Sequence, residues 1–196
     1  MTLLVLASAS ASRQRILKAA GVSFRVCPAD LDEPALIASL RDEPAIAIAT
    51  ALAEHKAVTV SRLNPGALVL GGDSVLVFGQ EIISKCHNLA ELKALLQRLS
   101  GKSHELISAA CLARDGAQIW HHADLARLAM RSLSEAFLDA YLAEGGESLL
   151  SSVGGYHYEG RGAQLFEQVE GDTFTILGLP LLAVLAALRT EGILAA

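Results

Sequence analysis

The chain opens with an apolar run that breaks into small hydroxylated residues before a helix begins. "LLVL" at residues 3–6 has the length and composition of a short buried strand, and "ASASASRQR" follows it with three serines and two arginines. Arg13 and Arg15 fall in the first turns of a helix predicted over 13–20. Hydroxyl and amide donors at a helix N-terminus, with a guanidinium beside them, favour an anion site. A serine-capped helix with solvent-facing arginines is the simpler alternative, and both interpretations stay open here.

The order of strands and helices predicts an α/β fold. Hydrophobic residues make up 52% of the chain but aromatic residues only 5%, so the core is expected to consist of Ala, Leu, Val and Ile. The 196 residues suffice for one well-buried domain and contain no obvious linker, which predicts a single domain over 1–196. Periodicity and capping residues predict further helices at 44–62, 88–101 and 134–146, and one after Pro180 through Leu188.

The expected strands form a partly parallel, partly antiparallel sheet. A strand is predicted in "SFRVCPA", followed by an acidic turn at "DLDEP". An apolar strand is predicted to end at Asp73, with a hairpin after it near Gly79. A second hairpin turns at Asp115-Gly116, a dipeptide typical of tight turns. "SSVGGYHYEGRG" is predicted to be a glycine-rich loop and "TFTILG" the last strand.

Charge, cysteines and hydropathy limit the partners that are expected. The formal net charge of −5 argues against a broad nucleic-acid surface or an acidic-membrane surface, so phosphate binding requires a local cluster of cations. Cys27, Cys86 and Cys111 have no CxxC spacing and are expected to be free thiols in the cytoplasm. The apolar stretch "ILGLPLLAVLAAL" is shorter than the roughly 20 residues that span a bilayer, so a buried helix is expected there.

Polar residues that can carry chemistry recur at the predicted ends of elements. Cations and hydroxyls can hold phosphates, while carboxylates can hold a hard divalent cation such as Mg²⁺. Each also has a plain structural interpretation, such as an exposed helix lysine, a turn-forming aspartate or a loop acid. The six histidines show no zinc spacing and are expected to be structural or surface residues. The candidate site residues are Ser8, Ser10, Arg13, Glu33, Lys56, Asp73, Lys85 and Glu159.

The opening "LASASASRQRIL" resembles the "LASxSPRRxxLL" opening of the Maf family of nucleotide pyrophosphatases. Further blocks look like later blocks of that family and occur in the same order along nearly the whole chain. They are "DE" at 32–33, "AEHKA" at 53–57, "GGDSVLV" at 71–77, "LSGKSHE" at 99–105, "GGYHYEG" at 154–160 and "GDTFTILGLPL" at 171–181.

The resemblance implies an intracellular enzyme that hydrolyses a nucleoside triphosphate between the α and β phosphates. Family members depend on a divalent metal (Mg²⁺ or Mn²⁺), are often dimeric, and share a two-lobed α/β fold with a curved sheet and a cleft between lobes, similar to the inosine triphosphate pyrophosphatase fold. A homodimer is therefore expected.

The resemblance also implies roles for the matching residues. Asp73 matches the family's proton acceptor, and Glu33 an acidic site residue, so these two carboxylates are the expected metal ligands. The expected phosphate or nucleotide contacts are Ser8, Ser10, Arg13, Lys56, Lys85 and Glu159.

Several positions depart from the family pattern. Ala11 and Ser12 replace Pro and Arg, so one cation is missing, and Arg15 is a candidate substitute on the same helix face. The "GKP" block reads "SKC", and an acid and a cation are missing in "SSVGGY". Glu159 stands where the dTTP/UTP branch has Gln, which favours a modified base such as 7-methylguanine. The alternatives are a dTTP/UTP pyrophosphatase and a nucleotide-binding regulator of cell division that has lost turnover.

Overall fold

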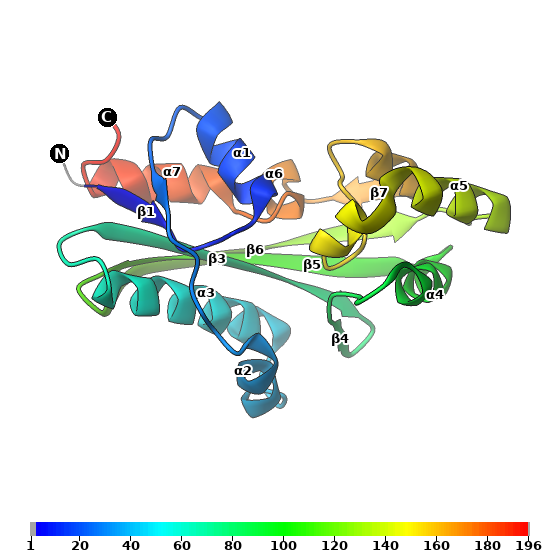
Figure 1. Cartoon of the computed structure of the whole chain (residues 1–196), viewed down its shortest axis with the longest axis horizontal. Coiled ribbons are helices and arrows are strands. Elements are labelled where there is room, and N and C mark those ends of the chain that lie inside the picture. The colour runs from blue at the N-terminus through cyan, green and yellow to red at the C-terminus, as the bar shows by residue number, and fades with distance from the viewer. Residues whose placement is uncertain (1–2, 196) are drawn as a thin grey trace. The chain divides into compact units, whose positions relative to one another are not determined.

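The computed structural model describes residues 3–195 and shows a mixed α/β fold in which helices flank a seven-stranded sheet (Figure 1). The strand order is β2-β1-β3-β5-β6-β7, and β4 pairs with β3. β1 is parallel to β2 and β3, whereas β4 is antiparallel to β3 and β7 to β6. The strands are β1 (Leu4–Leu6), β2 (Arg25–Val26), β3 (Leu68–Phe78), β4 (Glu81–Ile83), β5 (Ser103–Arg114), β6 (Ala117–Met130) and β7 (Phe166–Glu170). The predicted α/β class with a mixed sheet is confirmed.

The helices follow the predicted capping residues closely. Ser10, Asn88 and Ser134 each accept a hydrogen bond from a backbone N–H three residues on, at the start of α1, α4 and α5. The helices are α1 (Ala11–Ala19), α2 (Glu33–Ser39), α3 (Ala45–Arg62), α4 (Leu89–Leu99), α5 (Glu135–Gly145), α6 (Thr173–Ile176) and α7 (Leu181–Thr190), with 3₁₀ helices η1 (Gly146–Ser151) and η2 (Arg161–Leu165). Within residues 3–195, none of these helices combines the length and apolar character needed to traverse a bilayer.

The chain divides into two compact units, each assembled from separate segments. Unit 1 comprises 1–74, 107–124 and 173–196, and unit 2 comprises 75–106 and 125–172. Strands β3, β5 and β6 contribute residues to both units.

Unit 1 packs helices on both faces of its strands. α1 and α7 cover one face of β1 and the first part of β3, and α3 covers the other (Figure 1). Side chains alternate along a strand, so Leu68 and Leu70 join the cluster under α1 and α7, while Val69 faces α3. The cluster also contains Leu17 from α1 and Leu188 from α7, both fully buried.

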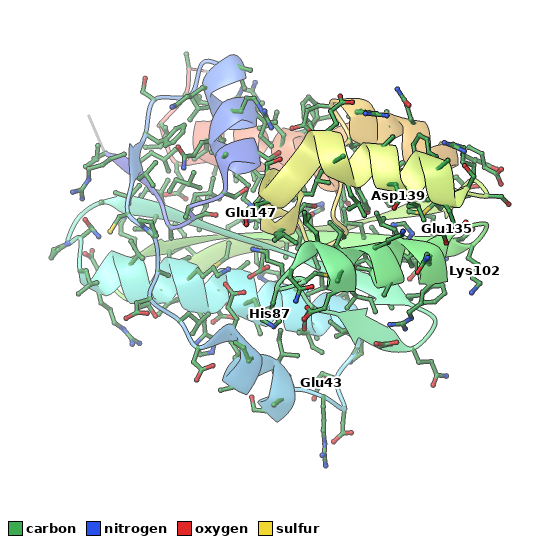
Figure 2. The ribbon with its side chains drawn as sticks, turned by 45° about the vertical axis from the view of Figure 1, so that its right-hand side comes forward. Glu43, His87, Lys102, Glu135, Asp139 and Glu147 are labelled. Atoms are coloured by element: carbon green, nitrogen blue, oxygen red, sulfur yellow. The ribbon has the colours of Figure 1, made fainter. Side chains whose placement is uncertain are left out.

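Unit 2 joins a helix pair to an aromatic cluster. Glu135 and Asp139 of α5 lie beside α4 (Figure 2), where both form ion pairs with Lys93, at 3.1 and 2.6 Å. The ring centroids of Tyr156 and Phe166 lie 4.9 Å apart in an edge-to-face arrangement. The ion pairs thus join α4 to α5, and the ring contact joins the loop that contains Tyr156 to the start of β7.

The structure corrects the predicted end of the third strand. β3 continues through Gly71, Gly72 and Asp73 to Phe78, so Asp73 lies within the strand rather than at its end. The two glycines had indicated a turn. In the structure, Gly71 instead allows α3 to pass close to β3, since a Cβ at this position would lie 2.2 Å from the Ala53 carbonyl oxygen. The strand that does end near this level of the sheet is the neighbouring β1, whose pairing with β3 stops at Leu6 and Leu70.

Three further predictions were wrong or incomplete. "TFTILG" forms the helix α6 instead of a strand, because its buried residues Thr175 and Ile176 are placed by tertiary packing that overrides their β propensity. The strand in this region is β7, which precedes α6 in the chain. "DLDEP" was predicted to be a turn, but it contains the start of a helix: Asp32 caps α2 and Pro34 lies in its first turn. β2 is limited to Arg25–Val26.

Candidate functional site

The close approach of α3 to β3 brings a lysine between two carboxylates. Gly71 and Asp73 lie two residues apart and so on the same face of β3, which is the face that α3 covers. Lys56 projects from α3, and its Nζ lies 2.5 Å from Asp73 Oδ2 and 2.6 Å from Glu33 Oε1. The side chains of Lys56 and Asp73 are each only 11% exposed, whereas that of Glu33 is 43% exposed. One nearly buried ion pair therefore extends to a carboxylate at the surface.

Arg13 occupies a buried socket of uncharged oxygen atoms on the α1 side of β3. Its Nε donates to the Gly178 carbonyl oxygen at 2.6 Å, Nη1 to Ser8 Oγ at 3.1 Å and Nη2 to Ser74 Oγ at 2.9 Å. Gly72 leaves room for this side chain, since a Cβ there would lie 3.2 Å from Nε. Arg13 is 8% exposed.

The electrostatics of Arg13 reflect this burial. Desolvation lowers the pKa of the guanidinium, and the negative charges of Asp73 and Glu33 oppose that shift. Three uncharged acceptors fix the orientation of the cation without neutralising it. The site thus holds a buried positive charge that an anionic ligand can stabilise further.

The serines of the opening loop have different tasks. Ser8 is buried and accepts from both Arg13 Nη1 and the Ser10 backbone N–H. Ser10 caps α1 by accepting from the Arg13 N–H. Ser12, in place of the family's cation, donates to the Leu177 carbonyl oxygen at 2.8 Å and so ties α1 to the segment after α6. Arg15 lies on the exposed side of α1.

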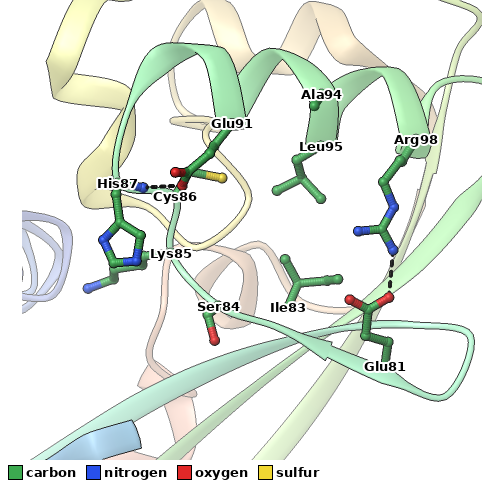
Figure 3. Close-up of a pocket in the computed structure, with 10 residues that line it drawn as sticks. All are labelled: Glu81, Ile83, Ser84, Lys85, Cys86, His87, Glu91, Ala94, Leu95 and Arg98. Carbon is green, nitrogen blue, oxygen red and sulfur yellow. Dashed lines mark hydrogen bonds and ion pairs between the residues drawn. The ribbon is translucent and has the colours of Figure 1, made fainter.

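Lys85 and Glu159 belong to unit 2, and the other candidate residues belong to unit 1. Lys85 lines a hollow of about 350 Å³ between β4 and α4 (Figure 3). Its apolar floor includes Ile83 and Leu95, and an Arg98–Glu81 ion pair of 2.5 Å lies at one end. Glu159 is exposed in the turn before η2.

The carboxylates of unit 1 offer the ligand chemistry that Mg²⁺ prefers. Mg²⁺ in phosphoryl-transfer sites is bound by one or two carboxylates and completes its shell with water and phosphate oxygens. Asp73 and Glu33 are two such carboxylates, brought together around one lysine amine. Within residues 3–195 there is no cluster of three or more His, Cys, Asp or Glu residues able to hold a metal ion by themselves. The two carboxylates are of the type that could hold a divalent cation together with ligands from outside the chain.

Two partners of Arg13, and one residue behind them, are not among the residues predicted from the sequence. Gly178, Ser74 and, behind Ser74, Ser108 complete the socket. Ser74 directly follows the candidate residue Asp73, and this adjacency could have identified it as a site residue. Ser108 lies in the apolar stretch "LISAACLA" of β5, where a single serine is equally consistent with a small core residue that has no role in a site. Gly178 contributes only its backbone, which no residue type reveals.

Comparisons with known proteins agree with the resemblance of the motifs. Residues 3–191 match the family described as Maf-like protein. A protein of Brucella abortus biovar 1 (strain 9-941) named 7-methyl-GTP pyrophosphatase is 48% identical over 190 residues, which is 96% of each chain. A Mesorhizobium japonicum protein with the same name is 47% identical over 191 residues, 96% of each chain. A Paramagnetospirillum magneticum protein named nucleoside triphosphate pyrophosphatase is 48% identical over 191 residues, 96% of this chain and 98% of its own.

Proposed function

The chain belongs to the Maf family, and we propose that it hydrolyses a nucleoside triphosphate to the nucleoside monophosphate and pyrophosphate. The observation that carries this proposal is the arrangement in unit 1: a nearly buried carboxylate, Asp73, paired with Lys56, and a buried guanidinium, Arg13, on uncharged partners. Such an arrangement combines a proton acceptor with cations for a polyphosphate. The names of the relatives support the same reaction.

In the proposed reaction a water oxygen bonds to the α-phosphorus while the bond from that phosphorus to the α–β bridging oxygen breaks. Asp73 accepts the proton of the water, and pyrophosphate leaves with the bridging oxygen. Arg13 has five N–H donors, of which three serve the socket, so the remaining donors are available to phosphate oxygens. Lys56 neutralises charge beside Asp73 before the nucleotide arrives and can turn its third N–H donor to phosphate.

A divalent metal, Mg²⁺ or Mn²⁺, is part of the proposal. When bound it would neutralise charge on the phosphate oxygens, and Glu33 and Asp73 are the side chains that would hold it. Lys85 is proposed as a further phosphate contact and Ser8 and Ser10 as the loop that positions Arg13 for the nucleotide. We also expect a cytoplasmic homodimer.

We propose a modified nucleotide such as 7-methyl-GTP as the preferred substrate. Methylation at N7 gives the base a positive charge, and the carboxylate of Glu159 can attract that charge and accept hydrogen bonds from base N–H groups. Two of the relatives compared above carry the name 7-methyl-GTP pyrophosphatase. The substitution Glu159→Gln would offer both a donor and an acceptor, and is expected to lower the preference for the methylated base.

The test is pyrophosphate release from a panel of nucleoside triphosphates that includes 7-methyl-GTP, GTP, dTTP and UTP, with Mg²⁺, with Mn²⁺ and with EDTA. Asp73→Asn, which keeps the size of the side chain but is a poor base, is expected to bind nucleotide and lose turnover. Pyrophosphate and monophosphate in equal amounts, dependent on metal and on Asp73, would support the proposal. Nucleotide binding without turnover by the wild type would favour the regulator, and highest activity on dTTP and UTP would replace the proposed substrate.

A further inference from the structure

A chain of hydroxyl groups leads from the Arg13 guanidinium into the interior of unit 1. Arg13 Nη2 lies 2.9 Å from Ser74 Oγ, which lies 2.8 Å from Ser108 Oγ, which in turn lies 2.7 Å from the Thr175 carbonyl oxygen. Ser108 is fully buried on β5, and Thr175 is fully buried on α6. The chain therefore connects three elements that are far apart in sequence to one cation.

The direction of every hydrogen bond in this chain is fixed by chemistry. The Thr175 carbonyl can only accept, so the single hydroxyl proton of Ser108 points to it. The Ser74 hydroxyl must then donate to Ser108 Oγ, which leaves its lone pairs for the Arg13 N–H. Arginine has no acceptor and stays protonated, so it cannot reverse the chain. Ser74 therefore accepts from Arg13, and Ser108 fixes the Ser74 hydroxyl proton on the side away from the guanidinium.

We infer that Ser108 is a positioning residue for the nucleotide site, acting through Ser74 on the orientation of Arg13. The inference rests on the proposed function, because it assumes that Arg13 binds the phosphate tail. Three acceptors hold the planar guanidinium: Gly178 at Nε, Ser8 at Nη1 and Ser74 at Nη2. A Ser74 hydroxyl that has lost Ser108 as its acceptor is free to rotate. The Nη2 end of the guanidinium is then held less firmly while Nε and Nη1 stay bound, which misaligns the donors that remain for phosphate.

Ser61 provides a matched control within the same unit. It is also a fully buried serine, its hydroxyl donates to the Val58 carbonyl oxygen at 2.9 Å and it accepts from the Gly116 N–H at 2.9 Å. Ser61→Ala therefore deletes a comparable buried hydroxyl that has no hydrogen bond to the Arg13 socket. Ser108→Ala and Ser61→Ala each lack only one side-chain oxygen atom relative to the wild type, so both variants are expected to fold.

The experiment measures the dissociation constants of an α,β-methylene nucleoside triphosphate analogue and of the corresponding monophosphate. Ser108→Ala is expected to weaken binding of the analogue about fivefold to tenfold and to change monophosphate binding less than about twofold, because Arg13 is assigned to the phosphate tail. Ser108→Thr keeps the hydroxyl and is expected to restore analogue binding. In a Ser74→Ala background, where Ser108 has no link to Arg13, Ser108→Ala is expected to add nothing.

Three results would overturn the inference: wild-type analogue binding by Ser108→Ala, an equal loss in Ser61→Ala, or a full additional loss when Ser108→Ala is combined with Ser74→Ala. Failure of the proposed function is a separate result. It would appear as wild-type protein that binds the analogue but releases no pyrophosphate, and the binding series still decides the role of Ser108 in that case.

Discussion

At the scale of single residues, Lys56 sets the charge balance of the site. Its amine is shared by Asp73 and Glu33, and the Lys56–Asp73 pair is largely shielded from water. An ion pair in such a place contributes little relative to an apolar pair, but removal of one partner leaves the other charge poorly solvated. The stability of unit 1 is therefore expected to depend on the lysine as much as activity does.

Replacement of Lys56 by Met is expected to lower the free energy of unfolding by about 2 kcal/mol, because Asp73 then lacks its counter-charge in a poorly hydrated position. Urea denaturation at pH 7 measures this. The matched control is Lys93→Met, since Lys93 also joins two carboxylates, Glu135 and Asp139, but with more exposed side chains. If Lys56→Met lowers the free energy of unfolding by no more than Lys93→Met does, the result would contradict the argument.

His104 is a second residue whose environment makes a measurable prediction. The imidazole is 2% exposed, and burial lowers its pKa from 6.5 to about 4. Nε2 lies 2.9 Å from the Tyr156 hydroxyl, while Nδ1 has no hydrogen-bond partner in the described part of the chain. The folded protein therefore holds this ring neutral.

The pH dependence follows from that lowered pKa. Above pH 6.5 the ring is neutral in both states, and as the pH falls the unfolded chain binds a proton that the folded chain does not. The free energy of unfolding should fall by roughly 3 kcal/mol between pH 6.5 and about 4, from this group alone. Urea denaturation at a series of pH values measures this, and the plot of the free energy of unfolding against pH should be flatter for His104→Gln than for the wild type over this range. An equal slope in the two proteins would contradict the prediction.

At the scale of elements, the contact between α3 and β3 determines the geometry of the Lys56–Asp73 pair. A methyl group at Gly71 would meet two backbone atoms of α3, the Ala53 oxygen at 2.2 Å and the Ala57 nitrogen at 2.8 Å. Backbone atoms cannot move aside as a flexible side chain does. Strand and helix would have to separate.

Gly71→Ala is accordingly expected to destabilise the protein by about 2 kcal/mol or more and to reduce turnover, since separation lengthens the contact between Lys56 and Asp73. Thermal unfolding and pyrophosphate release measure the two effects. Gly160→Ala is the control, because a Cβ there meets only the His157 oxygen, at an ordinary distance of 3.7 Å. A Gly71→Ala protein with wild-type melting temperature would show that the contact is more tolerant than its geometry indicates.

Elements also show where prediction from sequence succeeds. The helix predicted at 44–62 and the Asp115-Gly116 hairpin are confirmed, because periodicity, capping and positive φ are local properties. "TFTILG" and the Gly71-Gly72 pair misled because their conformations depend on partners distant in sequence: α6 on its burial, and Gly71 on α3. The same division applies to the site. Lys56 and Asp73 stand in recognisable blocks, whereas the Gly178 carbonyl and Ser108 are defined only by the tertiary contacts of Arg13.

At the scale of the whole molecule, unit 1 depends on the last segment of the chain. Residues 173–196 return to the strands formed by the first 74 residues and supply α7 to the core under α1. They also supply the Gly178 carbonyl that anchors Arg13 and the Thr175 carbonyl that ends the hydroxyl chain. The core and the socket of unit 1 are thus completed by the same segment.

A chain that ends at residue 172 is therefore expected to lose both the fold of unit 1 and nucleotide binding. It lacks Leu179, Leu181, Val184 and Leu188, which are at most 3% exposed in the structure. Each buried side chain of this size contributes roughly 2 kcal/mol or more, so their combined loss approaches the roughly 5–15 kcal/mol that a folded domain typically has. A chain that ends at residue 192 keeps α7 and serves as the control. Circular dichroism, denaturation and binding of the triphosphate analogue compare the two chains. Analogue binding by the shorter chain at wild-type affinity would mean that Arg13 is held for the nucleotide without Gly178 and Thr175, contrary to the arrangement described for this site.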